Sequence, residues 1–266
     1  MRLSVKHSTS YHYDAPVDYG LQQVRLTPKE REGQKMLQWD IAIEGGHKEL
    51  HFTDHHANRV DLISIDPGGE QLVIRITGEV ETTDTAGVIG PHHGFMPLWM
   101  FERQTSLTTP GPRIGALVKA LELEFDNDIA RAHALSALIV ERVPYATGQT
   151  DAETSAEQAV TAGSGVCQDH AHIFITAMRL LGHPARYISG YLMMNDRIEQ
   201  DATHAWAEAW FDGIGWLGFD VSNGHSPDSR YIRVASGLDY MDAAPVSGMR
   251  FGVSVESMAV QLQVQQ

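Results

Sequence analysis

The sequence predicts an α+β fold in which a β-sandwich-like first half precedes a second half of helices followed by antiparallel strands. Apolar residues recur with a period of two through roughly the first 110 residues, and no sustained helical period interrupts them. After the turn-rich stretch that ends at Pro112, apolar residues recur at the three- and four-residue spacing of helices. We therefore expect a β-rich domain over residues 1–110, an α+β domain over 111–250 and a β tail over 251–266.

The expected strands of the first half are read from runs in which apolar positions share one parity. These positions are Leu3, Val5, Tyr11 and Tyr13 in the first run, Leu37, Trp39, Ile41 and Ile43 in the second, and Leu72, Ile74 and Ile76 in the third. Prolines and paired glycines separate the runs, as is typical of the turns between strands. The weaker alternation of residues 249–264 predicts that the tail returns as strands to one of the layers.

Three helices are expected next, over residues 127–143, from about 155, and over 167–181. Asp126 or Asn127 can cap the first helix, and Pro144 ends it. The second helix opens with a capping-box pattern over residues 154–157, and Gly182 follows the third at the position where helices commonly end. Strands are then expected over 185–193, 203–211 and 216–221, and they would pack as an antiparallel sheet against the helices.

Charge and cysteine content exclude several functions. There are 20 Lys and Arg against 34 Asp and Glu, which gives a net charge of −14, so nucleic acid is not an expected partner. A single cysteine excludes an intramolecular disulfide and every cysteine-rich metal centre. The N-terminus lacks a secretory pattern and no apolar run approaches the ~20 residues of a membrane span, so we expect a cytoplasmic protein with no membrane partner.

The lone cysteine, Cys167, follows a Gly163-Ser164-Gly165 turn and falls at the start of the third expected helix. Free backbone N–H groups and the positive end of the helix dipole favour the thiolate there, and they can also stabilise an oxyanion. An inert buried cysteine is the alternative.

A thiolate nucleophile needs a base that is held in position. His204 is the best placed of 14 histidines, because in a strand it shares one face with Trp206 and Glu208 while alanines occupy the other. A core histidine bonded to backbone is the alternative. Asp220 ends the next strand, but an ideal hairpin places residue 204 opposite about residue 223, so a contact between His204 and Asp220 requires a bulge or a loop that adjusts the register.

Residues 165–172, 204–208 and 215–220 together resemble the transglutaminase-like superfamily, and in particular bacterial transglutaminase-like cysteine proteases with a β-rich N-terminal region. The resemblance extends over about residues 140–250, and its three separated motifs follow the family order of Cys, His and Asp. It implies that the domain over 111–250 is a papain-like, transglutaminase-like catalytic core.

The resemblance further implies a catalytic triad in which Cys167 is the nucleophile, His204 the base and later the acid, and Asp220 the group that orients the imidazole. The implied reaction is acyl transfer on an amide bond of a peptide or protein through a thioester, with hydrolysis first and protein-glutamine transamidation as an alternative. The Cys167 amide would bind the oxyanion, and Tyr145, Gln168 and Trp206 are candidate oxyanion or substrate residues. No cofactor is expected.

The sequence departs from the family pattern at His170, where phenylalanine is usual, at Val221, where proline is common, and at Leu238, where arginine is. His170 and His172, together with the cysteine and His204, suggest zinc as a rival, but residues two apart on a helix point to different faces. No metal is therefore expected, and the pairs His55-His56 and His92-His93 are expected in polar loops bonded to water. A second rival is a non-catalytic binding module on the same fold.

Overall fold

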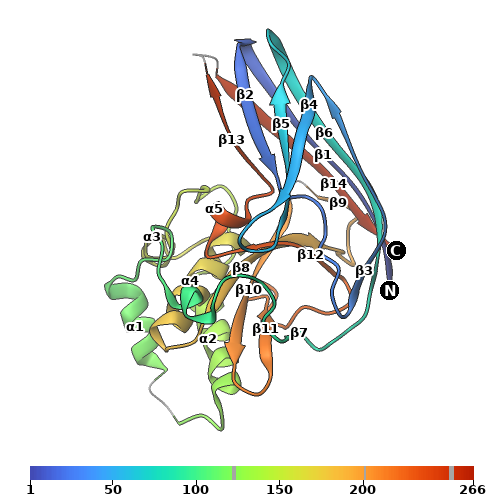
Figure 1. The fold of residues 1–266 in the computed structure, drawn as a ribbon. Helices are drawn as coiled ribbons and strands as arrows, with labels where there is room; N and C mark the ends of the chain where they lie inside the picture. The colour runs from blue at the N-terminus through green and yellow to red at the C-terminus, as the bar shows by residue number, and fades with distance from the viewer. Residues whose placement is uncertain (122–123, 201, 252–254) are drawn as a thin grey trace.

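The computed structural model describes residues 1–121, 124–200, 202–251 and 255–266, and Figure 1 shows a strand-rich upper part beside a mixed helical and β core. The strand-rich part consists of two sheets. One has the order β3 (Gln34–Glu44), β6 (Gly69–Thr82), β1 (Arg2–Val17), β14 (Glu256–Gln265) and β9 (Glu199–Gln200). The other has the order β13 (Val246–Phe251), β2 (Tyr19–Val24), β5 (Arg59–Ile65) and β4 (Gly46–Thr53).

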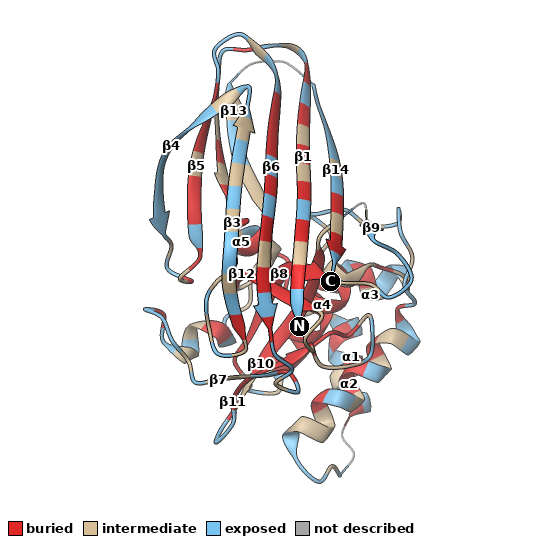
Figure 2. Cartoon of the chain, turned by 90° about the vertical axis from the view of Figure 1, so that its right-hand side faces the viewer, coloured by how far each residue is buried: buried red, intermediate tan, exposed pale blue. Residues whose placement is uncertain are grey.

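Side chains from both sheets form one apolar cluster, so the predicted sandwich is confirmed. The cluster includes Leu3 and Val5 of β1, Ile74 of β6, and Val24 and Ile65 of the facing sheet. The alternation predicted for β1 appears in Figure 2 as bands of buried and less buried residues along that strand.

One residue of β3 departs from the prediction. Leu37 was expected to share the inner face with Trp39, but it is 42% exposed. The pairing of β3 with β6 shifts between Met36 and Gln38, so a bulge inserts Leu37 into the strand and turns it outward.

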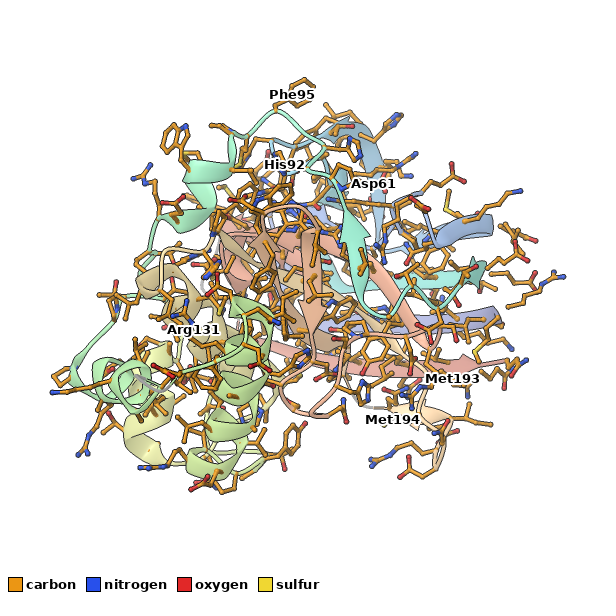
Figure 3. All side chains as sticks on the ribbon, turned by 90° about the horizontal axis from the view of Figure 1, so that it is seen from below. Asp61, His92, Phe95, Arg131, Met193 and Met194 are labelled. Carbon is orange, nitrogen blue, oxygen red and sulfur yellow. The ribbon has the colours of Figure 1, made fainter. Side chains whose placement is uncertain are left out.

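The C-terminal residues return to the sandwich as predicted. β13 pairs antiparallel with β2, and β14 pairs antiparallel with β1 over Ser4 to Tyr13, which brings the two chain termini together (Figure 1). Met193 and Met194, labelled in Figure 3, follow the core strand β8 and divide between two apolar clusters. Met193 packs against the sandwich, and Met194 packs beside Trp206.

The core contains a second five-stranded sheet with helices packed against it. Its strand order is β12 (Tyr231–Gly237), β8 (Ala185–Leu192), β10 (His204–Phe211), β11 (Gly215–Phe219) and β7 (Val88–Gly90). The helices are η1 (Leu98–Glu102), α1 (Pro112–Ala120), α2 (Asp128–Arg142), α3 (Ala156–Ala162), α4 (Cys167–Leu180) and α5 (Tyr240–Ala243). The alanines of β10 join the apolar cluster of α4, so the small side chains let this helix approach the sheet closely. Within the described ranges, no helix has the length and apolarity needed to cross a bilayer.

The helix ends agree with most predicted caps. The Asn127 side chain accepts a hydrogen bond from Ala130 N (2.9 Å) and so caps α2, and Gly182 has a φ of +84° just past α4. The capping box lies one residue later than predicted, between Ser155 and Gln158. Glu157 is therefore free to accept backbone hydrogen bonds from the first turn of α1, a helix that the sequence patterns did not predict.

Candidate active site

Cys167 is the first residue of α4 and is partly buried. The turn before it is held by Asp169, whose carboxylate accepts hydrogen bonds from Val166 N (2.8 Å) and Thr150 Oγ1 (2.7 Å). A Cβ on Gly165 would lie 2.8 Å from the Asp169 side chain, so glycine is needed for this close approach. The thiol therefore lies at a fixed helix N-terminus, beside backbone N–H groups with no partner inside the helix.

His204 begins β10, and its Nε2 lies 2.5 Å from Oδ2 of Asp220. The hairpin of β10 and β11 pairs Phe211 with Gly215, so residue 204 falls opposite residue 222 rather than 223. Asp220 lies beyond the end of β11, in a turn where its backbone N–H donates to His225 O (2.9 Å). This turn moves Asp220 away from the position it would have in an ideal hairpin and brings its carboxylate to the imidazole of His204.

Asp220 is almost fully buried and accepts further hydrogen bonds. Its Oδ2 accepts from Tyr231 Oη (2.7 Å) and from Asn223 Nδ2 (2.7 Å), and its Oδ1 accepts from Asn223 N (3.2 Å). Sequence reasoning missed both partners. Asn223 carried a local signal, since Asp and Asn three residues apart favour a side-chain-stabilised turn, whereas Tyr231 comes from β12 and carried none.

The electrostatics of this pair favour an ion pair. Burial alone would lower the pKa of His204, but the neighbouring Asp220 carboxylate, and after it a hydrogen bond with Cys167, raise that pKa above its ordinary value. Burial opposes charge on Asp220 as well, yet the imidazole and the hydrogen bonds from Asn223 and Tyr231 lower its pKa. Since Nε2 is bound to Asp220, Nδ1 is the ring nitrogen that remains for the thiol.

Cys167 and His204 line a shared cavity of about 260 Å³. Strands of the sandwich complete it, because His7, Thr9 and Tyr11 of β1 and Met258 and Val260 of β14 also line it. His7 Nδ1 lies 2.9 Å from Tyr191 Oη, and burial lowers the pKa of His7 to about 4, so this imidazole is neutral near pH 7. None of the described lining residues is Lys, Arg, Asp or Glu.

The three further candidates lie in different surroundings. Tyr145 is 55% exposed and pairs with Gly165 in the turn before the cysteine, and its pKa is raised by partial burial and then by Cys167. Gln168 lines the cavity and donates Nε2 to Ala152 O (3.3 Å). Trp206 lies outside the lining: it is buried, and its ring stacks on that of His204 with centroids 6.2 Å apart. Trp206 thus packs against the ring of His204 and supports it.

The histidines of α4 have separate structural partners. His170 Nδ1 lies 2.7 Å from Ser222 Oγ, and its Nε2 lies 2.7 Å from Val143 O. His172 Nε2 accepts a hydrogen bond from Tyr240 N (3.1 Å), and burial lowers the pKa of His172 to about 3. These contacts hold both rings away from a shared metal position.

The prediction that His56 and His92 lie in polar loops and bind water is wrong. The His56 side chain is 1% exposed, and its Nε2 lies 3.1 Å from Asp242 Oδ2. His92 accepts a hydrogen bond from Trp216 Nε1 (3.2 Å) and its Nε2 lies 2.6 Å from Met96 O. Asp242 and Trp216 are far from these histidines in the sequence, and Met96 is reached through a local turn. The sequence pattern revealed neither kind of contact.

Comparisons with known proteins agree with this architecture. Residues 116–221 match the transglutaminase-like superfamily, and residues 3–81 match the bacterial transglutaminase-like N-terminal region. The chain therefore has a transglutaminase-like core preceded by a bacterial transglutaminase-like N-terminal region, which confirms the resemblance.

Individual relatives extend the match to both parts of the chain. An uncharacterized protein of Mycobacterium leprae is 25% identical over 99% of this chain and 98% of its own. The crystal structure titled "a Putative Cysteine Protease from Cytophaga hutchinsonii" superposes with a TM-score of 0.77 at 22% identity, covering 100% of this chain and 91% of that one, and so shares the fold. A protein-glutamine gamma-glutamyltransferase of Pseudomonas aeruginosa is 28% identical over 50% of this chain and 23% of its own.

Proposed function

We propose that the chain is a cysteine-dependent acyl-transfer enzyme, a cysteine protease or amidase of the transglutaminase-like type. Cys167 is its nucleophile, His204 its base and acid, and Asp220 the group that orients and charges the imidazole. The observation that carries the proposal is the 2.5 Å contact between His204 Nε2 and the buried Asp220 carboxylate, beside a cysteine at a helix N-terminus. This arrangement supplies the charged partner, the orienting group and the N–H donors that nucleophilic catalysis needs.

Before the reaction the thiol proton has passed to His204 Nδ1, and in the first half the Cys167 thiolate attacks the carbonyl carbon of the amide. The carbonyl oxygen becomes an oxyanion, which the Cys167 backbone N–H stabilises. His204 then gives its proton to the leaving nitrogen, the carbon–nitrogen bond breaks, and a thioester remains on the cysteine. Asp220 stays ionised throughout and holds the proton on Nε2.

In the second half, His204 removes a proton from the incoming nucleophile. Water releases a carboxylate and regenerates the thiol, which is hydrolysis. A primary amine in place of water gives a new amide, which is transamidation. The named Pseudomonas aeruginosa relative favours the amine as the second candidate, whereas the open, partly polar lining beside the thiol admits water.

The part of the substrate that enters the cavity is uncharged. Its described lining offers tyrosine, threonine, methionine and valine side chains, and His7 is neutral, so no group there balances a charged substrate side chain. We therefore propose a peptide or protein substrate that presents an apolar side chain or a carboxamide next to the reacting carbonyl. The cytoplasmic location stays a prediction from the sequence.

The proposal is tested by alkylating the single cysteine with iodoacetamide across pH, read by mass spectrometry of the intact protein. We expect reaction well below pH 8, and loss of this low-pH limb in His204→Ala, because the imidazolium that stabilises the thiolate is gone. His12→Ala, an exposed position on β1, is the matched control. An ordinary thiol profile in both the wild type and His204→Ala would reject the catalytic role and leave a binding module.

The fate of the acyl group is decided separately. A peptide library incubated with a primary amine and analysed by mass spectrometry distinguishes cleaved peptides, deamidated glutamine and amine adducts in one experiment. Cleavage or deamidation supports hydrolysis, and amine adducts support transamidation. Cys167→Ser gives the background of each product, and products equal to that background would reject both activities.

A further inference from the structure

A second cavity, of about 580 Å³, lies between the sandwich and the core, and it is rich in cationic side chains. Lys29 and Arg31 reach it from the connection between β2 and β3, Arg186 from β8 and Arg233 from β12. Its described lining shares no residue with that of the cavity at the cysteine. Such a concentration of positive charge is unusual in a chain whose net charge is −14.

One carboxylate lies among these cations. Glu208, fully buried on β10, accepts hydrogen bonds from Arg186 Nε (2.6 Å) and from Arg233 Nε (2.7 Å). Arg31, Arg186 and Arg233 around one carboxylate leave an excess of two positive charges. Lys29 Nζ donates to the neutral acceptors His56 O (2.8 Å) and Ser236 Oγ (3.0 Å). Burial, followed by Arg233 and Arg186, lowers the pKa of Lys29 well below its usual value, so a bound anion would favour its charged form.

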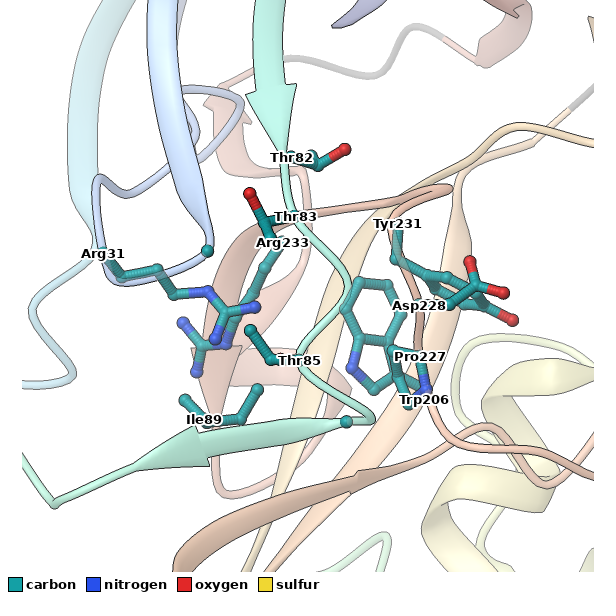
Figure 4. A pocket seen from close by; sticks show the side chains of 12 residues that line it. Arg31, Thr82, Thr83, Thr85, Ile89, Trp206, Pro227, Asp228, Tyr231 and Arg233 are labelled. Carbon is teal, nitrogen blue, oxygen red and sulfur yellow. The ribbon is translucent and has the colours of Figure 1, made fainter. Parts of the chain in front are cut away.

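Arg31 contributes one charge to this excess, and it has the least satisfied side chain of the group. Figure 4 shows its guanidinium beside that of Arg233, and burial, followed by that neighbouring cation, lowers the pKa of Arg31 to about 10. Arg31 Nε and Nη1 are buried and have no hydrogen-bond partner among the described residues. Unpaired buried donors on a charged group cost free energy, and two guanidinium groups side by side add repulsion.

The other acidic residues of the lining do not remove this excess. Glu30 and Glu32 are exposed, and within the described part of the chain neither forms an ion pair with the four cations. Arg59 also lines the cavity, but its side chain is half exposed and its Nη2 lies 3.6 Å from Asp61, a carboxylate that it shares with Lys48. Glu208 thus offsets only part of the positive charge, and no carboxylate of the described lining pairs with Arg31.

We propose that this cavity binds a small oxyanion with two negative charges, of the phosphate monoester or dicarboxylate class. The unpartnered fork of Arg31 suits two oxygens of one such group. Arg233, whose Nε and Nη2 already bind Glu208, and Lys29 would add positive charge beside it. The anion would join the connection that bears Lys29 and Arg31 to strands β8 and β12. Its binding requires neither Cys167 nor His204, so the site is independent of the proposed acyl transfer.

Thermal melting with added inorganic phosphate or malonate, each compared with sodium chloride at equal ionic strength, tests this site. We expect the wild type to gain about 2–4 °C at an anion concentration about five times the dissociation constant. Arg31→Gln removes the unpaired guanidinium, so this variant should melt no lower than the wild type in chloride and should lose the gain. Arg142→Gln, at an exposed position on α2, should keep the gain.

Isothermal titration calorimetry provides a second readout that does not depend on melting. We expect Arg31→Gln and Lys29→Gln each to weaken anion binding at least tenfold, while Arg31→Lys, which keeps the charge without the fork, loses less. Stronger binding of phosphate than of malonate assigns a phosphate ester, and the reverse assigns a dicarboxylate. An unchanged melting temperature in both anions, or an equal gain in Arg31→Gln, would overturn the proposal.

Discussion

Replacing Asp220 by asparagine would remove the negative charge beside His204 and almost none of the volume. The side chain now accepts four hydrogen bonds, three at Oδ2 and one at Oδ1. An amide offers one acceptor oxygen and one donor nitrogen, so every orientation turns an NH₂ group toward an existing donor. The less costly orientation keeps oxygen at the Oδ2 position and sets the NH₂ against the backbone N–H of Asn223.

The stability cost can be estimated from that contact. Asn223 is exposed and its N–H can bind water instead, so this one lost hydrogen bond costs about 0.5–1.5 kcal/mol. Each kcal/mol lowers the melting temperature of a chain of this size by about 2–4 °C. Because Asp220 raises the pKa of His204, the wild-type pair contributes fully below pH 6.5 and is lost as the pH rises through the folded-state pKa. The difference between Asp220→Asn and wild type should therefore shrink at alkaline pH.

The substitution Asp220→Asn should also lower the reactivity of Cys167. Without the carboxylate, burial dominates and lowers the pKa of His204, so the imidazolium that stabilises the thiolate is lost near neutral pH. We expect alkylation at pH 6 to slow at least tenfold, equivalent to about 1.4 kcal/mol. Asp212→Asn, on the exposed hairpin turn, is the matched control. Wild-type melting and a wild-type pH profile in Asp220→Asn would refute this account of the pair.

Three further changes test the surrounding structure by thermal melting. Glu208→Gln should cost about 3–5 kcal/mol because it leaves Arg186 and Arg233 without their charged partner. The neighbours of Glu208 lower its pKa to about 2, so the stability of the wild type should fall as the pH drops from about 4.5 toward 2. Glu157→Gln should cost about 1–3 kcal/mol, because its carboxylate accepts three backbone hydrogen bonds at the start of α1. Ala207→Leu should cost about 1–3 kcal/mol by overpacking the sheet against α4. An unchanged melting temperature would contradict each.

Local sequence signals predicted the elements that carry the candidate site. The Gly163–Gly165 turn, the helix start at Cys167 and the alternation through His204 each depend on residues close in the chain, so periodicity and capping rules reveal them. The predicted register between β10 and β11 differs by one residue from the register in the structure. A three-residue turn over 212–214 with Gly213 at positive φ joins these strands, where a four-residue connection was expected.

Contacts between distant segments could not be predicted in this way. Tyr231 reaches Asp220 from β12, and Tyr11 and Met258 reach the cavity at the cysteine from two paired strands of the sandwich. Their positions depend on how the sandwich packs on the core, which no local pattern encodes. The same applies to Lys29 and Arg31, which in the sequence belong to an ordinary polar connection.

The strand β10 links the two cavities physically. His204 and Glu208 lie four residues apart on the same face, a separation of about 14 Å along a strand. Arg233 reaches Glu208 from β12 across β8, so this one carboxylate holds three neighbouring strands in register. The position of the His204 ring relative to Cys167 depends on that register, since β10 carries the imidazole and α4 packs on its other face. An anion bound by Arg31 would tie the connection between β2 and β3 to Arg233 of β12, which already holds Glu208, and it would touch neither Cys167 nor His204.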